Sequence, residues 1–308
     1  MSLLDDLREQ LSALDAQHLR RVRRANQIPC GAKMRVDGRE LLSFCSNDYL
    51  GLAADPTVAK ALIESVVRYG VGAGASHLVS GHFDVHERLE ARLAAFTGCE
   101  SALYFTTGYM ANVGVIPALV GRGDAIFADR LIHASLVDGA LLSRANLVRY
   151  AHNDVAALAR ALEESSATNK LIVTDAVFSM DGDIAPLAQL LALAEQHDAW
   201  LLVDDAHGFG VLGPQGRGTL AEAGLDSWRI VLIGTLGKAA GVSGAFAAGH
   251  ADVIEWLLQK ARTGIFTTAS PPILAEALLA SIDQIERGDF RRERLHTMVD
   301  NFRGSLKL

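Results

Sequence analysis

The sequence predicts an α/β fold with a mainly parallel, seven-stranded sheet and helices on both of its faces. Three observations predict it: short apolar runs recur along the chain, helical patterns lie between most of them, and Gly, Asp or Asn bounds each run. Strands that alternate with helices favour a doubly wound, parallel sheet. The expected strands cover residues 102–105, 125–128, 147–150, 171–174, 200–203, 230–233 and 245–248.

Three segments organise the rest of the chain. Residues 1–45 predict a helical arm followed by a short hairpin around Asp37-Gly38, residues 46–275 hold the large α/β domain, and residues 276–308 begin a further helical domain. Within the large domain, apolar residues at helical spacing from Leu187 onward predict a helix with Pro186 at its first position.

The composition excludes several classes of protein. The chain has 308 residues, 50% of them hydrophobic, and a formal charge of -7, so a nucleic-acid partner is not expected. The first residues do not match a targeting signal, and no apolar run reaches the ~18 residues of a membrane helix. Cys30, Cys45 and Cys99 lack the spacing of a disulfide framework or a zinc site. We expect a cytoplasmic protein without a membrane span.

Two carboxylates and an imidazole follow the apolar run 200–203. Asp204, Asp205 and His207 stand where a buried strand ends, and a buried carboxylate is costly unless it has a partner. A solvated turn is one interpretation of this pair of acids. The alternative is that Asp204 meets a buried cation, such as a protonated pyridine nitrogen.

Residues 208–213 satisfy the G-x-G-x-x-G pattern of dinucleotide-binding loops. Such a loop must open a helix, whereas Pro214 and two further glycines follow here, and the next strand ends in Gly-Thr rather than in an acid. We interpret the match as accidental and keep an NAD-dependent oxidoreductase as a minor alternative.

Lys238 follows the next strand, in the segment Thr235-Leu-Gly-Lys238-Ala-Ala-Gly241. A lone lysine usually lies at the surface. Here the glycines allow close approach of the backbone, and apolar surroundings lower the pKa of an amine, as a Schiff-base lysine requires. A P-loop is excluded because Ala follows Lys238.

Other polar residues follow further strands. His133 is able to stack on a planar ring, and Ser179 follows a predicted strand. A purely structural role is the alternative for each, as a hydrogen-bonded histidine and as a turn residue. Gly108 and Tyr109 open a predicted helix, whose free backbone N–H groups suit a phosphate. His77, His82 and His86 form no H-E-x-x-H pattern and no closed ligand set, so no metal is expected.

Taken together, these segments resemble the α-oxoamine synthase family of fold-type-I pyridoxal 5'-phosphate (PLP) enzymes. The resemblance extends over nearly the whole chain. It rests on residues 46–52, 77–81, 129–135, 152–154, 177–186, 204–218 and 235–244. It implies the fold of a fold-type-I PLP transferase, with residues 46–275 as the PLP-binding domain.

The resemblance also implies a role for each matching residue. Lys238 would form the Schiff base with the cofactor, Asp204 would hold the pyridine nitrogen, and His133 would stack on the ring. The phenolic oxygen would be approached by His207 and Ser179, and the phosphate would be bound by Gly108, Tyr109 and Thr235. Thr267 and Thr268 match a segment that reaches the phosphate of a neighbouring subunit, which implies a homodimer with shared active sites.

The implied reaction is a decarboxylative condensation of L-alanine with a pimeloyl thioester, in biotin biosynthesis. The acyl carrier is coenzyme A or an acyl carrier protein, and Arg21, Asn47 and His133 would contact the substrates. Residues 179–187 favour the pimeloyl reaction, whereas residues 235–239 favour glycine C-acetyltransferase, so that activity or another one in the family remains an alternative.

Residues 276–308 look like the start of a small C-terminal domain that is incomplete. In the family this domain provides an arginine for the carboxylate of the amino acid, so no residue here is assigned that role. A catalytically impaired PLP-binding protein is therefore a further alternative.

Overall fold

The computed structural model describes residues 2–306 and divides into two compact units, one up to Cys45 and one from Ser46 onward. In the first unit, α1 (Leu3–Ala16) begins after Ser2, whose side chain accepts a hydrogen bond from the backbone N–H of Asp5. The strands β1 (Lys33–Val36) and β2 (Arg39–Leu42) pair antiparallel.

The turn of this hairpin is set by its two central residues. Asp37 and Gly38 have positive φ angles of 51° and 73°, as a two-residue hairpin loop requires. The helix and the hairpin expected in this segment are both present.

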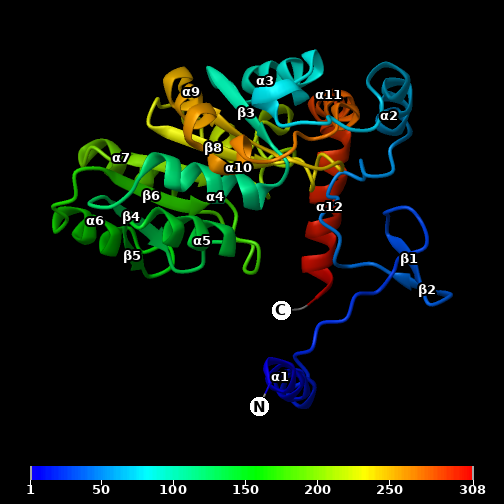
Figure 1. Ribbon diagram of the computed structural model, residues 1–308, viewed down its shortest axis with the longest axis horizontal. Coiled ribbons are helices and arrows are strands. Elements are labelled where there is room, and N and C mark those ends of the chain that lie inside the picture. Colours follow the sequence, from blue (N-terminus) through cyan, green and yellow to red (C-terminus); the bar gives the residue numbers. More distant parts are fainter. Residues whose placement is uncertain (1, 307–308) are drawn as a thin grey trace. The chain divides into compact units, whose positions relative to one another are not determined.

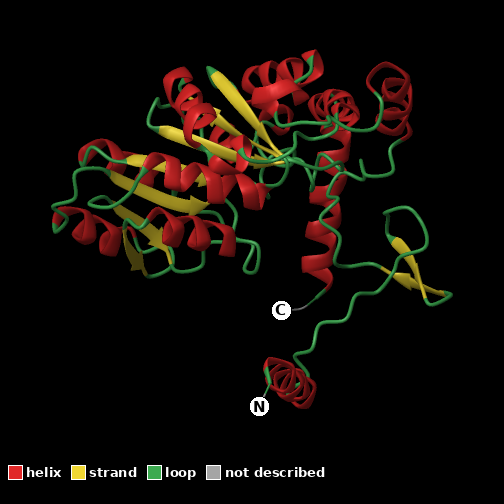
Figure 2. Cartoon of the chain, viewed as in Figure 1, coloured by secondary structure: helices red, strands yellow, loops and turns green. Residues whose placement is uncertain are grey.

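A seven-stranded sheet is the frame of the second unit (Figures 1 and 2), with the strand order β3-β9-β8-β7-β6-β4-β5. All seven predicted strands are present, and their ends differ from the prediction by a residue or two. They are β3 (Ser101–Phe105), β4 (Ala125–Asp129), β5 (Asn146–Tyr150), β6 (Lys170–Asp175), β7 (Trp200–Asp204), β8 (Ile230–Thr235) and β9 (Ala245–Gly249).

The sheet is mainly parallel, as predicted, and contains one reversed strand. Neighbouring strands from β5 through β4, β6 and β7 to β8 run parallel, whereas β9 is antiparallel to both β8 and β3. The reversal has a local cause: residues 236–244 are too few to form a crossover helix, so the chain turns back beside β8.

Both faces of the sheet are buried under helices. In β4, Ile126 and Ala128 belong to one buried cluster and Phe127 to another, as the alternation of side chains along a strand requires. The first cluster includes residues of α4 (Gly108–Leu119), α5 (Ala134–Ser143) and α9 (Ala251–Lys260), and the second includes residues of α6 (Val155–Glu163) and α7 (Leu187–Gln196).

The remaining α-helices include α3 and α11, which share a third buried cluster with β3 and β9. They are α2 (Pro56–Tyr69), α3 (Asp84–Thr97), α8 (Thr219–Glu222), α10 (Arg262–Ile265), α11 (Pro272–Glu286) and α12 (Asp289–Ser305), and a π-helical turn covers His77–Gly81. The division expected at residue 275 stays a prediction.

Two smaller expectations are settled by the helices. The predicted helix near Leu187 is α7, but it begins one residue later than expected, so Pro186 is its N-terminal cap rather than its first residue. Among residues 2–306, no helix has both the length and the apolar character that a membrane crossing needs.

Candidate active site

A pocket opens at the carboxyl ends of the parallel strands β6, β7 and β8, the usual place for a ligand in such sheets. Seven of the predicted site residues line it together: Gly108, Tyr109, His133, Asp204, His207, Thr235 and Lys238. They come from the ends of β4, β7 and β8 and from the start of α4, and the fold alone brings them together. We call this cavity the pocket.

The loop that carries Lys238 is fixed by its own backbone. The N–H of Gly241 donates to the carbonyl of Lys238 at 2.9 Å, and the N–H of Leu236 donates to the carbonyl of Gly244 at 2.9 Å. Gly241 has a φ of 68°, and a Cβ there would lie 2.4 Å from the backbone nitrogen of Ala53. Only glycine fits this position, so the loop packs directly against the backbone before α2.

The amine of Lys238 starts a line of hydrogen bonds. Its Nζ lies 2.8 Å from Nε2 of His207, the Nδ1 of His207 lies 2.7 Å from Oη of Tyr49, and this hydroxyl lies 3.3 Å from Oδ1 of Asn47. A charged ammonium group only donates, so Nε2 accepts and Nδ1 of the neutral ring carries the proton. Tyr49 then accepts from His207 and donates to Asn47.

Burial sets the protonation of these two groups. It lowers the pKa of Lys238, against the opposing effect of the Asp204 and Asp175 charges. Burial, with contributions from Lys238 and His133, also lowers the pKa of His207 to about 4. The pocket therefore holds a neutral imidazole next to an amine that loses its proton more readily than a surface lysine, as a nucleophilic lysine requires.

The two adjacent acids, Asp204 and Asp205, have different surroundings. Asp204 faces the pocket, where its carboxylate accepts from Nδ2 of Asn112 at 2.7 Å and from the N–H of Ala206 at 3.0 Å. Asp205 points away and accepts from both the hydroxyl and the N–H of Thr219, and burial raises its pKa to about 7. Asp204 is thus available to a ligand, and Asp205 holds the following loop.

Asn112 and Asp175 also line the pocket, although they are not among the predicted site residues; the same holds for Ser135, Ala206 and Ile233. Asn112 is buried on α4, donates to Asp204, and has an Oδ1 without a hydrogen-bond partner among the described residues. Asp175 ends β6 and pairs in register with Asp204, and burial together with the Asp204 charge raises its pKa. Asn112 could have been found from its position four residues after Gly108, on the same face of the helix. Asp175 could have been found because it ends a strand, as Asp204 does.

His133 and the start of α4 complete the pocket. The ring of His133 lies with Nδ1 2.7 Å from the hydroxyl of Ser135, and its backbone N–H donates to Asp175 at 2.8 Å. At the start of α4, a Cβ added to Gly108 would lie 3.7 Å from the hydroxyl of Thr235. A helix N-terminus with an adjacent hydroxyl suits an anion such as a phosphate.

Five predicted residues do not line the pocket. Ser179 is exposed in the loop after β6, Thr267 and Thr268 follow α10, and Asn47 reaches the pocket only through Tyr49. Arg21 belongs to the first unit and is exposed. The roles expected for these residues stay predictions.

Two motifs of doubtful meaning are clarified by their surroundings. The glycine-rich segment 208–213 opens no helix of its own, because a short turn follows and α8, which begins only at Thr219, has 4 residues. A dinucleotide-binding loop requires a helix at this point. The oxidoreductase alternative therefore loses its structural basis.

The three histidines His77, His82 and His86 do lie together, with ring nitrogens within 4.8 Å of one another. The Nδ1 atoms of His77 and His82 are hydrogen-bonded to each other at 2.8 Å. Both nitrogens of His86 are also used, because Nδ1 accepts from the N–H of Phe83 and Nε2 donates to the carbonyl of Ser270. This packing leaves His86 no free ligand atom, and the expectation of no metal stays a prediction.

Comparison with known proteins gives a consistent result. A model of the family described as aminotransferase class I and II matches residues 39–308. The 8-amino-7-oxononanoate synthase of Azoarcus sp. (strain BH72) is 69% identical over 307 residues, which is 100% of this chain and 79% of that protein. The enzyme of the same name from Aromatoleum aromaticum (strain DSM 19018 / LMG 30748 / EbN1) is 71% identical, over 99% of this chain and 79% of that protein.

Solved structures agree with these relatives. Serine palmitoyltransferase from S. paucimobilis, with a bound PLP–myriocin aldimine, is 33% identical with a TM-score of 0.89, over 96% of this chain and 78% of that chain. The 8-amino-7-oxononanoate synthase of Francisella tularensis is 33% identical with a TM-score of 0.71, over 82% of this chain and 71% of that chain.

Proposed function

The chain belongs to the aminotransferase class I and II family, and from that premise we propose that it catalyses the PLP-dependent synthesis of 8-amino-7-oxononanoate in biotin biosynthesis. The reaction joins L-alanine to a pimeloyl thioester, with loss of carbon dioxide and release of the free thiol. One observation carries this proposal: two relatives that match essentially the whole chain, at 69% and 71% identity, bear the name of this one activity.

The chemistry of the pocket fits PLP. The aldehyde of PLP requires an amine, its pyridine nitrogen a carboxylate, and its phosphate a set of N–H and hydroxyl donors. Lys238 and Asp204 supply the first two, and the start of α4 at Gly108 with the adjacent Thr235 supplies the third. When bound, PLP provides an electron sink that stabilises negative charge on the α-carbon of the amino acid.

The residues of the pocket would bind and orient the cofactor and would move a proton of the substrate. Lys238 Nζ, whose pKa burial lowers, would take the α-proton of alanine, and His207 Nε2 at 2.8 Å would hold this amine in place. Asn112 and the N–H of Ala206 hold the carboxylate of Asp204 in the orientation that would retain a proton on a pyridine nitrogen. His133, held by Ser135 and Asp175, would cover one face of the ring.

The partners are part of the same proposal. Thr267 and Thr268 lie outside the pocket, next to Phe266, whose side chain is 69% exposed. This position supports their expected contribution to the site of a second copy in a homodimer. The arginines between residues 20 and 24 are all exposed and would suit an acidic acyl carrier protein. A cytoplasmic location is proposed because Cys45 and Cys99 form no disulfide.

A substrate panel tests the proposed function. The purified chain, loaded with PLP, is supplied with alanine or glycine and with pimeloyl-CoA or acetyl-CoA, and release of free thiol is measured. We expect alanine with pimeloyl-CoA to give the highest kcat/KM, and no turnover with the Lys238→Ala variant. A higher kcat/KM for glycine with acetyl-CoA would replace the proposal with glycine C-acetyltransferase.

A further inference from the structure

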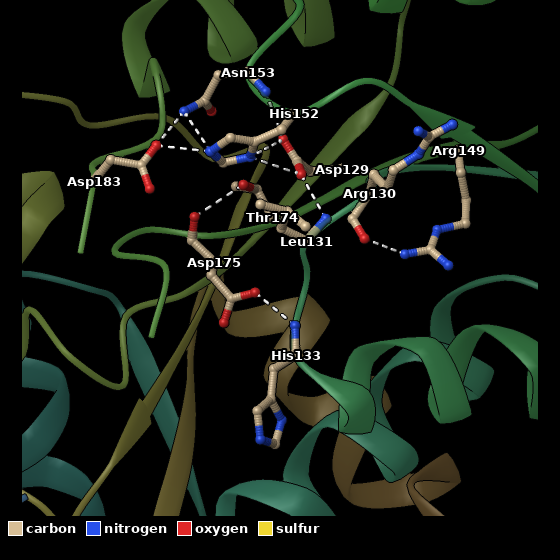
Figure 3. A network of polar contacts seen from close by, with 10 residues as sticks. All are labelled: Asp129, Arg130, Leu131, His133, Arg149, His152, Asn153, Thr174, Asp175 and Asp183. Atoms are coloured by element: carbon tan, nitrogen blue, oxygen red, sulfur yellow. Dashed lines mark hydrogen bonds and ion pairs between the residues drawn. The ribbon is translucent and has the colours of Figure 1, made fainter. Parts of the chain in front are cut away.

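A second polar cluster lies beside the pocket, at the ends of β4 and β5 (Figure 3). Asp129 ends β4 with only 1% of its surface exposed, and its two oxygens accept from the N–H groups of Leu131 and Asn153, each at 2.8 Å. The same oxygens lie 3.0 Å and 3.1 Å from Nδ1 of His152. We call Asp129, His152 and Asp183 the anchor.

His152 lies between two carboxylates. Its Nδ1 faces Asp129, and its Nε2 lies 2.7 Å from Oδ2 of Asp183, which also accepts from Nδ2 of Asn153 at 2.7 Å. A carboxylate only accepts hydrogen bonds, and a neutral imidazole has a single N–H donor. Two charged partners therefore favour the doubly protonated imidazolium ring, and Nδ2 of Asn153, which lies 3.3 Å from Nε2, is closer to Asp183.

The electrostatics of the anchor support this protonation state. Burial acts to lower the pKa of His152, but the hydrogen bonds to Asp129 and Asp183 outweigh it and raise the pKa. The charged groups that face the ring are Asp129 from β4 and Asp183 from the loop after β6. The ring of Phe178, perpendicular to that of His152 at 4.5 Å between centroids, is uncharged.

The anchor contacts two loops, of which the first ends at His133 in the pocket and the second begins after Asp175 in the pocket. Residues 130–133 connect β4 to α5, and they are held at one end by Asp129 through Leu131 and at the other by Asp175 through the N–H of His133. Figure 3 shows the ring of His133 pointing away from these contacts.

The second loop follows β6 and contains Ser179. It is closed by a bridge between Val177 and Ile184 and by the hydrogen bond from the N–H of Phe178 to the carbonyl of Asp183, at 3.0 Å. His152 is the side chain that contacts the first loop through Asp129 and the second through Asp183.

We propose that His152 is a positioning residue which, as an imidazolium between Asp129 and Asp183, fixes the loops that carry His133 and Ser179. Its effect on catalysis rests on the proposed function, whereas its charge and its effect on the fold do not. His152 does not line the pocket, so it would act through the backbone of the two loops.

The pH dependence follows from the sign of the shift. The pKa of His152 is higher in the folded chain than the ordinary histidine value of 6.5, so its contribution to stability is complete below pH 6.5. This contribution is lost as the pH rises through the raised pKa.

Nuclear magnetic resonance of the apoprotein tests the charge directly. Ring nitrogen signals of His152, assigned by their loss in His152→Gln, should show two protonated nitrogens at pH 7 and a pKa above that of a free histidine. His296→Gln, which replaces an exposed histidine of α12, is the matched control. A single protonated ring nitrogen at pH 7 would overturn the proposal, because the imidazole ring would then be neutral.

Kinetics test the positioning role. We expect His152→Gln to lower kcat about tenfold and to change KM less than about threefold, because a displaced catalytic group costs rate more than binding. His152→Arg keeps a planar cation with several donors, so it should recover part of the lost kcat and keep it at alkaline pH, where the wild type declines. An unchanged kcat in His152→Gln would contradict the role.

A milder variant covers the case in which His152→Gln does not fold. Asp183→Asn removes only the half-exposed partner and leaves Asp129 satisfied. Asp183→Asn should lower the pKa of His152 and reduce kcat by a smaller factor than His152→Gln. An unaltered pKa of His152 would show that Asp183 does not stabilise the imidazolium ring. A wild type without any condensation activity would refute the proposed function, while the resonance measurement would still decide the charge of His152.

Discussion

The pocket around Lys238 and the anchor around His152 lie at the same edge of one sheet, but they use hydrogen bonds differently. In the anchor, Asp129 accepts with both oxygens and His152 uses both nitrogens. In the pocket, among the described residues, Lys238 Nζ has one hydrogen-bond partner and Oδ1 of Asn112 has none. The difference teaches that the pocket keeps polar groups open to a ligand, whereas Asp129 and His152 use theirs to hold the surrounding loops. Within the anchor, only Oδ1 of Asp183 has no hydrogen-bond partner among the described residues.

The two histidines have opposite electrostatics because their neighbours carry opposite charges. His207 is buried beside a lysine, which lowers its pKa to about 4, whereas His152 is bonded to two acids, which raise its pKa against the effect of burial. One imidazole is therefore a neutral acceptor and the other a cation. Replacements in either region should thus have effects of different kinds.

The largest effect is expected from Lys238→Ala. It removes the amine that the pocket surrounds, so we expect activity to fall by a factor on the order of 10³ or more, with little loss of folding stability. Thiol release and thermal unfolding are the measurements. Lys260→Ala, at an exposed lysine of α9, is the control and should retain activity.

The next largest effect is expected from replacing one carboxylate in the pocket and one in the anchor. Asp204→Asn should lower kcat by about 10²-fold, because the carboxylate toward the ligand is lost, and should change stability by less than about 1 kcal/mol. Asp129→Asn should instead lower the free energy of unfolding by about 2–4 kcal/mol, because a buried ionic contact is lost. Its effect on kcat should be smaller than that of Asp204→Asn. Equal profiles for the two variants, by denaturant unfolding and kinetics, would remove the distinction.

A smaller effect lies in the pH dependence of the melting temperature. The pKa of His207 is lowered in the folded chain, so the contribution of His207 to folding stability is present above pH 6.5 and is lost as the pH falls towards 4. The pKa of His152 is raised, so the contribution of His152 is lost as the pH rises. We expect His207→Gln to lose its stability difference from the wild type at acid pH, and His152→Gln to lose it at alkaline pH, each over a few degrees. Differences with the same sign of pH dependence would contradict the comparison.

The smallest effect is expected from Tyr49→Phe. It removes the hydroxyl that fixes Nδ1 of His207 and leaves the ring in place. One neutral hydrogen bond contributes about 1 kcal/mol, so kcat should fall about fivefold. The ring nitrogen signals of His207 should report a mixture of tautomers, and a single unchanged tautomer with full activity would show that Tyr49 has no role.

Much of the sheet could be predicted because apolar runs of strand length are a strong local signal. The strands end within a residue or two of the prediction, and Lys238, Asp204 and His207 all follow strand ends, which meet at one edge of a parallel sheet. The antiparallel direction of β9 follows from a short loop rather than from its own residues. Direction is a property of the connection, and strand patterns do not encode it.

The residues that support the site were harder to predict. Asn112 and Asp175 act through contacts between segments far apart in the chain, such as the 2.7 Å bond from Asn112 to Asp204. Only the resemblance to a family marks the segment 152–154 in the sequence, and its link to Asp129 and Asp183 depends on the order of β4, β5 and β6 in the sheet. Long-range polar contacts of this kind leave no periodic pattern in the sequence.

The most direct test of the central claim, that the pocket binds PLP through Lys238, is borohydride reduction of the PLP-loaded protein followed by peptide mapping. The account predicts a phosphopyridoxyl group on the peptide that contains Lys238, and its absence in Lys238→Ala. A protein that carries no such group, or carries it on Lys170 or Lys260 instead, would contradict the account.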